Sequence, residues 1–153
     1  MNDDDFILLG EWEDDTPNHG ALILPIDEQG RYLLQLRDHN PDAIYPGLWG
    51  LFGGKAEADE TLPEIAVREF EEETGLVITA DQLRPFARIF SRETRAGRGN
   101  WRLYCYTMEF RGEARDIRLG EGAGFGFIRP EDVNELAVVP FVTKVINALK
   151  NVR

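Results

Sequence analysis

Three closely spaced glutamates form the group in this sequence best suited to chemistry. Glu69, Glu72 and Glu73 lie in the segment AVREFEEETG, and on a helix this spacing places the three carboxylates along one side. The apolar stripe of the same helix consists of Leu62, Ile65, Ala66 and Phe70. Glu69 and Glu73 fall within that stripe and Glu72 borders it, whereas ordinary surface glutamates would lie opposite. Carboxylates held against a core require a cation, because moving each charge out of water is costly.

The chemistry of these side chains favours one kind of cation. Carboxylate oxygens are hard ligands that prefer Mg²⁺ or Mn²⁺ to softer metals. A zinc site is not expected, since His19 and His39 are isolated in turn-rich segments. A set of surface ion pairs is the alternative for the three glutamates. Cys105 lies in the apolar stretch LYCYTM and is predicted to be a buried structural thiol.

The helix that positions the glutamates has clear start and stop signals. Thr61 and Glu64 have the spacing of a capping box. Gly75 can adopt the left-handed conformation that ends many helices, which gives it a structural role. We predict a helix at about residues 62–74, with an ion pair between Glu64 and Arg68 on its solvent side.

The flanking segments have the pattern of strands. Gly53 and Gly54 follow the short apolar piece WGLF and permit close approach of the backbone to a ligand. Alternation predicts that Phe86 and Arg88 share one face of their strand. The expected strands are residues 20–26, 31–37, 85–92, 101–110 and 124–128, with a turn at 27–30, a loop at 38–48, a hairpin turn ETRAGRGN at 93–100 and a terminal helix at 141–151.

The charge of the chain limits the classes of molecule that it is expected to bind. The 153 residues match the size of one domain, and the formal net charge is −11 at pH 7. Such a charge disfavours binding to nucleic acid or to an anionic membrane. Residues 1–18 form an acidic segment unlike a signal peptide, and no apolar run has membrane-spanning length, so we expect a cytoplasmic protein.

The central segment also resembles a known family. Residues 54–76 fit the pattern G-x5-E-x7-R-E-U-x-E-E-x-G-U, where U is a bulky apolar residue, without a mismatch. The matching residues are Gly54, Glu60, Arg68, Glu69, Phe70, Glu72, Glu73, Gly75 and Leu76. This resembles the Nudix box. The resemblance implies an α/β protein, a Nudix-type α/β/α sandwich with a central mixed β-sheet, and a single Nudix hydrolase domain over residues 1–153.

The resemblance also implies roles for individual residues. The family's metal-binding positions match Glu69, Glu72, Glu73 and the backbone of the Gly53/Gly54 turn, with Gly54 taken as the ligand. Two further positions match residues that order the box: Arg68, counted with the catalytic group, and Glu60, a structural residue. Glu121, in the loop before the last strand, is the candidate for a further metal ligand or the general base. Whether the base is Glu69, Glu121 or another residue stays open.

The implied reaction is Mg²⁺-dependent, or Mn²⁺-dependent, hydrolysis of a phosphoanhydride bond. The expected partner is a nucleoside diphosphate linked to another moiety, either a nucleotide sugar or a nucleoside triphosphate. Arg37, Arg102 and Gly53 are candidate substrate contacts. The arginines around Arg102 fit a solvated hairpin equally well. Where many relatives read FPGG this chain reads LFGG, and the subgroup signatures leave the substrate open.

Two other functions fit parts of the pattern. A non-catalytic nucleotide-binding regulator would share the fold, but such proteins usually lose box carboxylates that this chain retains. An isopentenyl-diphosphate-type isomerase relies on a reactive cysteine, and Cys105 inside a strand is poorly placed for that role. The resemblance makes a homodimer plausible.

Overall fold

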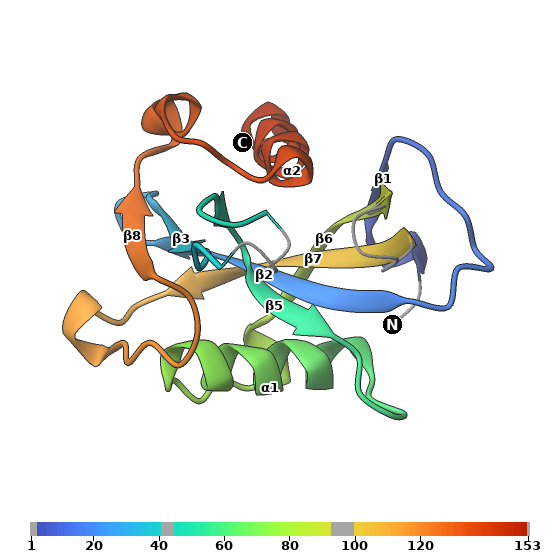
Figure 1. The fold of residues 1–153 in the computed structure, drawn as a ribbon, viewed down its shortest axis with the longest axis horizontal. Coiled ribbons are helices and arrows are strands. Elements are labelled where there is room, and N and C mark those ends of the chain that lie inside the picture. Colours follow the sequence, from blue (N-terminus) through green and yellow to red (C-terminus); the bar gives the residue numbers. More distant parts are fainter. Residues whose placement is uncertain (1–2, 41–44, 93–99, 153) are drawn as a thin grey trace.

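A mixed β-sheet lies between two helices in the computed structural model, which describes residues 3–40, 45–92 and 100–152 (Figure 1). α1 (Leu62–Thr74) covers one face and α2 (Pro140–Val152) covers the other. The eight strands among these residues are β1 (Ile7–Leu9), β2 (His19–Asp27), β3 (Tyr32–Leu36), β4 (Trp49–Gly50), β5 (Phe52–Lys55), β6 (Arg84–Arg92), β7 (Asn100–Phe110) and β8 (Gly124–Ile128). The predicted α/β/α sandwich with a mixed sheet is therefore confirmed.

The strand order places β2 next to the strands that carry candidate site residues. The main path of the sheet is β1-β6-β7-β2-β3-β4. β5 pairs antiparallel with the first half of β2, and β8 pairs antiparallel with β3. β2 is parallel to β7 along its whole length, and this pairing places β2 at the centre of the sheet. The continuous apolar run of β2 follows from this position, since both of its faces are buried.

Each face of the sheet has its own hydrophobic core. Ile23 of β2 packs with Phe52 and Phe70 on the α1 side, where the two phenylalanine rings meet edge to face with centroids 5.5 Å apart. Leu24, the next residue of β2, packs on the α2 side with Val142. Alternate residues of β2 therefore pack against α1 on one side of the sheet and α2 on the other.

The acidic N-terminal segment is part of the fold. Within residues 1–18, β1 pairs parallel with β6 and forms the edge of the sheet. Phe6 is 4% exposed, and its ring meets those of Tyr104 and Tyr106 edge to face. Trp12 packs over the Arg88 guanidinium at 4.6 Å. The charge pattern of the segment gave no signal for these apolar contacts.

The prediction that Phe86 and Arg88 share a face is wrong. The register between β6 and β7 shifts between Pro85 and Ala87, which is a β-bulge at Phe86. Phe86 therefore packs on the α2 side, whereas Arg88 lies against Trp12 in the other layer. The predicted hairpin turn at 93–100 lies almost entirely outside the described residues. None of the helices in the described part of the chain could span a membrane.

The capping box of α1 is confirmed and gives a first prediction. The Thr61 hydroxyl accepts a hydrogen bond from the Glu64 N–H, and the Glu64 carboxylate accepts one from the Thr61 N–H at 2.9 Å. Thr61→Ala removes one of these bonds and should lower the stability by about 1 kcal/mol, or roughly 2–4 °C in Tm. Thermal unfolding followed by circular dichroism measures this. Glu71→Ala, at an exposed position of the same helix, should change Tm by less than half as much; equal losses would contradict the capping role.

Candidate active site

Three carboxylates from two elements converge beside β5. Oxygen atoms of Glu69, Glu73 and Glu121 lie within 4.8 Å of one another, the one such group among the described residues. Glu69 and Glu73 project from α1, and Glu121 comes from the loop before β8. Glu73 is buried, Glu69 is half-buried and Glu121 is exposed, so the group extends from the core to the surface. A set of hard oxygen ligands with this excess of negative charge fits a divalent cation such as Mg²⁺ or Mn²⁺.

The most deeply buried member of this group is Glu73, with 4% exposure. Burial raises the pKa of Glu73 to about 8, and the charges of Glu69 and Glu121 act in the same direction. Hydrogen bonds from the Gly53 N–H, at 2.7 Å, and from Gln35 oppose this rise. Within the described part of the chain this carboxylate has polar partners but forms no ion pair with a basic side chain, a condition that a metal ion would relieve.

Glu69 depends on the absence of a side chain at Gly54. A Cβ on Gly54 would lie 2.5 Å from the Glu69 carboxyl carbon, so only glycine allows the strand and the carboxylate to approach this closely. Burial raises the pKa of Glu69, and a hydrogen bond from Arg68 Nη1 at 2.9 Å opposes the rise.

The backbone of the two glycines faces different partners. The Gly54 carbonyl oxygen lies against β2, 2.5 Å from the position that a Cβ on Gly20 would occupy. The Gly53 N–H instead points to Glu73. The Gly53 N–H therefore positions Glu73, and the absence of a side chain at Gly54 leaves room for Glu69.

Arg68 connects the helix to the loop before it. Its Nε and Nη2 donate to the two oxygens of Glu60 at 2.7 and 2.8 Å, and Nη2 also donates to the Lys55 carbonyl at 3.0 Å. These bonds lower the pKa of Glu60 and raise that of Arg68. The predicted Glu64–Arg68 ion pair is wrong, because Glu64 caps the helix and the Arg68 side chain turns back toward the site.

Glu72 lies beside the group rather than in it. Its side chain is 48% exposed, and one oxygen is 3.3 Å from Arg68 Nη1. The same nitrogen bonds Glu69, so the two carboxylates share one cationic partner. Glu72 is thus adjacent to Glu69 without joining the three converging carboxylates.

The loop that contains Glu121 is attached to the rest of the site by its backbone. The Gly120 N–H donates to the Glu73 carbonyl at 3.0 Å, and the Ala123 N–H donates to the Leu36 carbonyl at 2.9 Å. A Cβ on Gly120 would collide with the carbonyl of Glu72, so the loop approaches the end of α1 more closely than another residue would allow. Glu121 is held between α1 and β3 in this way.

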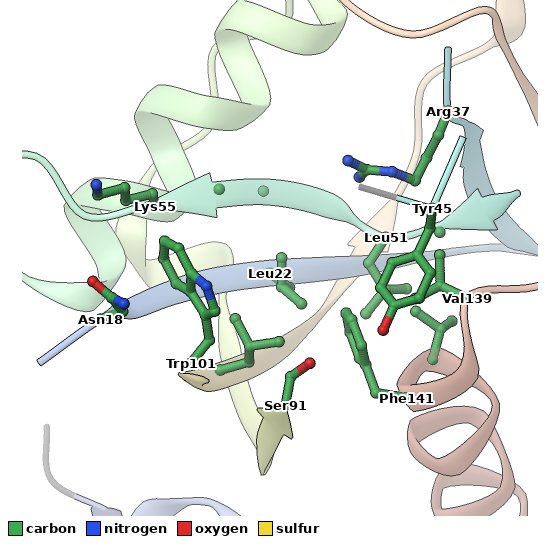
Figure 2. Close-up of a pocket in the computed structure, with 15 residues that line it drawn as sticks. Asn18, Leu22, Arg37, Tyr45, Leu51, Lys55, Ser91, Trp101, Val139 and Phe141 are labelled. Carbon is green, nitrogen blue, oxygen red and sulfur yellow. The ribbon is translucent and has the colours of Figure 1, made fainter. Parts of the chain in front are cut away.

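An elongated pocket of about 510 Å³ lies on the α2 side of β5 (Figure 2). Its wall includes Gly53 and Gly54, whose other side borders the carboxylates. Lys55, Asn18 and Trp101 lie at one end, and Arg37, Tyr45 and Phe141 lie at the other. The apolar side chains of Leu22, Leu51, Leu103, Val139 and Val142 form much of the remaining lining. The Lys55 ammonium is 5.8 Å from the centre of the Trp101 ring, so this end combines a cation with an aromatic surface.

The two arginines predicted to contact substrate lie in different places. Arg37 lines the pocket. Arg102 lies on the other face of β7, where its Nε donates to the Thr16 carbonyl at 2.8 Å and its Nη1 lies 3.5 Å from the Tyr104 hydroxyl. The structure thus gives Arg102 a role in holding the N-terminal segment and does not place it at the pocket.

Several lining residues were missed from the sequence. Because neighbouring residues of a strand face opposite sides, the alternation in β7 indicates that Trp101 faces away from Arg102, and this was the available signal for its position. Lys55, Tyr45 and Phe141 come from three separate segments, and only the fold brings them to one pocket.

Cys105 does not support isomerase chemistry. The side chain is buried in the α2-side core, and burial raises the pKa of the thiol to about 12. A thiolate nucleophile requires the opposite environment.

Comparison with known proteins agrees with this geometry. The family model described as the NUDIX domain matches residues 16–149. An uncharacterized Nudix hydrolase of Pseudomonas aeruginosa is 34% identical over 134 residues, covering 86% of this chain and 75% of the relative. The nucleoside triphosphatase NudI of Escherichia coli is 28% identical over 120 residues, covering 74% of this chain and 84% of that protein.

The fold has a similar counterpart among solved structures. The MutT Nudix hydrolase from Burkholderia pseudomallei superimposes with a TM-score of 0.72 at 23% identity, covering 88% of this chain and 98% of that one. The family match spans both the carboxylate group and the pocket. The chain belongs to the Nudix family and is a hydrolase that acts on pyrophosphate bonds.

Proposed function

We propose that this protein is a Mg²⁺-dependent pyrophosphohydrolase that cleaves a phosphoanhydride bond in a nucleoside diphosphate linked to another moiety. The observation behind this proposal is the position of the Gly53/Gly54 backbone between two sites. The carboxylates lie on one side of it and the aromatic-lined pocket on the other. A substrate with its base in the pocket could extend its phosphates past the glycines to the carboxylates.

The proposed metal ligands are Glu69, Glu73 and Glu121, with Glu72, which shares the Arg68 Nη1 contact with Glu69, as a further candidate. Gly54 remains the candidate main-chain ligand through its carbonyl oxygen, as the resemblance implies, and the Gly53 N–H holds Glu73 in place. Mn²⁺ suits the same oxygen ligands. A bound divalent ion would supply the positive charge that offsets the charge developing on the diphosphate.

Residues of the chain supply the proposed general base and the contacts to the substrate. Glu121 is also the proposed general base, through a carboxylate oxygen that does not bind the metal, since this residue is exposed whereas Glu69 is engaged by Arg68. Arg37 can contact a phosphate at the edge of the pocket. The largely apolar lining favours a planar base over a sugar, because a sugar needs more hydrogen-bonding partners. The relative NudI is a nucleoside triphosphatase, which is consistent with a triphosphate as one candidate substrate.

A panel of nucleoside triphosphates and nucleotide sugars, each with Mg²⁺, tests the reaction. We expect release of a nucleoside monophosphate together with pyrophosphate or a phosphorylated sugar, identified by mass spectrometry. Omitting Mg²⁺ should abolish turnover. Binding of a panel member without any hydrolysis would favour the regulator instead.

The raised pKa of Glu73 predicts that the stability of the metal-free protein falls as the pH rises. The folded-state pKa of about 8 lies above the usual 4.5, so the folded protein binds more protons than the unfolded chain in this interval. The stability contributed by Glu73 is therefore complete below pH 4.5 and lost as the pH rises toward 8. Glu73→Gln removes that loss and should raise the Tm of the metal-free protein at pH 8 by roughly 2–4 °C, but not at pH 4.5.

The same variant should lose the increase in Tm that Mg²⁺ gives the unmodified protein, and its hydrolysis should fall below detection. Differential scanning calorimetry with and without Mg²⁺ measures the first effect. Glu71→Gln, at an exposed position of α1, is the matched control and should behave as the unmodified protein. A full Mg²⁺ response in Glu73→Gln would remove this residue from the metal site.

Stacking of a base on Trp101 predicts an effect on KM. Trp101→Leu should raise KM by about tenfold, since base–aromatic stacking contributes on the order of 1–3 kcal/mol. Trp101→Phe retains an aromatic face and should stay within about threefold of the unmodified protein. Steady-state kinetics on the best substrate of the panel would show this; equal KM values for Leu and Phe would place the base elsewhere.

A further inference from the structure

We propose that Gln35 is a positioning residue that holds Glu121 and Glu73 in the arrangement that binds the divalent cation. This inference rests on the proposed function, since it assumes that the carboxylates bind a metal. Gln35 lies on β3, outside the Nudix box, and does not itself join the group of carboxylates.

One side-chain amide reaches both elements of the site. Gln35 Nε2 donates to the Glu121 carbonyl at 3.2 Å, and the same side chain hydrogen-bonds the Glu73 carboxylate. A glutamine amide has two N–H donors, so a single group can serve the loop and the helix together. The Gln35 side chain thus links Glu121 directly to Glu73, in addition to the backbone bonds that attach the loop.

The loop is shaped to pass closely over this amide. Gly122 has φ +89°, and a Cβ there would lie 3.0 Å from Gln35 Nε2 and 2.9 Å from the Leu36 carbonyl. The Ala123 N–H bonds the same carbonyl at 2.9 Å. The turn after Glu121 therefore rests directly on Gln35 and its neighbour.

Packing alone does not account for a glutamine at this position. Gln35 is 3% exposed and follows Leu33 and Leu34, which are fully buried. Burying an amide is costly unless it is hydrogen-bonded, and an apolar residue would fill the same space without that cost. The amide is explained by its two partners, both of which belong to the site. Residues that orient metal ligands in this way typically change metal affinity about 10–100-fold when removed.

The test measures binding of Mn²⁺ alone, without substrate, by isothermal titration calorimetry. Gln35→Leu keeps a buried side chain of similar size and removes both donors, and we expect its Kd for Mn²⁺ to rise about 10–100-fold. Gln29→Leu, in the exposed turn between β2 and β3, is the matched control and should bind as the unmodified protein. An unchanged Kd in folded Gln35→Leu would overturn the inference.

A second variant approaches the contact from the loop and leaves the core intact. Gly122→Ala places a methyl group against Gln35 Nε2 and should also weaken Mn²⁺ binding, even if Gln35→Leu fails to fold. Wild-type affinity in Gly122→Ala would contradict the proposed contact.

A double-mutant cycle separates positioning from a general loss of structure. If Gln35 acts through Glu121, the effect of Gln35→Leu should shrink to less than about threefold in the Glu121→Gln background. If Gln35→Leu weakens Mn²⁺ binding equally with and without Glu121→Gln, Gln35 does not act through Glu121. Failure of the unmodified protein to bind Mn²⁺ would remove the proposed function as well, whereas normal binding with no effect of Gln35→Leu would remove the inference alone.

Discussion

The contact between the Glu73 carboxylate and the Gly53 N–H is the constraint on which the site depends. It requires a charged side chain to point into the space between α1 and the sheet, where burial raises its pKa to about 8. β5 can approach the helix this closely because Gly54 has no side chain to meet Glu69, and Gly53 has none to meet β2. The capping box and the left-handed Gly75 then fix where the helix begins and ends, and hence which residues face the strand. The burial that the proposed metal ligand Glu73 requires therefore lowers the local stability of the metal-free protein.

The helix and its chemistry could be predicted because they depend on local periodicity. Glu69 and Glu73 stand where packing calls for apolar residues, and that anomaly is visible in the sequence. Arg68 was assigned to solvent by the same rule, but its long side chain turns back to Glu60 and Glu69. Angular position on a helix describes where a side chain starts, and it does not describe where a flexible guanidinium ends.

The contacts made across the sheet could not be predicted in this way. Gln35 meets Glu121 across 86 residues of sequence, and the pocket combines residues from β5, β7 and α2. Alternation failed at Phe86, because a bulge inserts one residue and reverses the face of those that follow. The acidic composition of residues 3–15 also concealed Phe6 and Trp12, which complete a core that begins before the family match at residue 16. These features arise from pairing between distant strands, which single-sequence patterns do not describe.

The placement of β5 between two layers has a consequence for how this enzyme could diversify. Because the carboxylates and the aromatic pocket lie on opposite sides of one strand, they share backbone and almost no side chains. Substitutions in the pocket can therefore leave the carboxylates undisturbed, whereas a side chain at Gly53 would meet β2 and one at Gly54 would meet Glu69. Under the proposed function, the bond that is broken and the molecule that is chosen would depend on separate sets of residues, so a lineage could acquire a new substrate without passing through an inactive form.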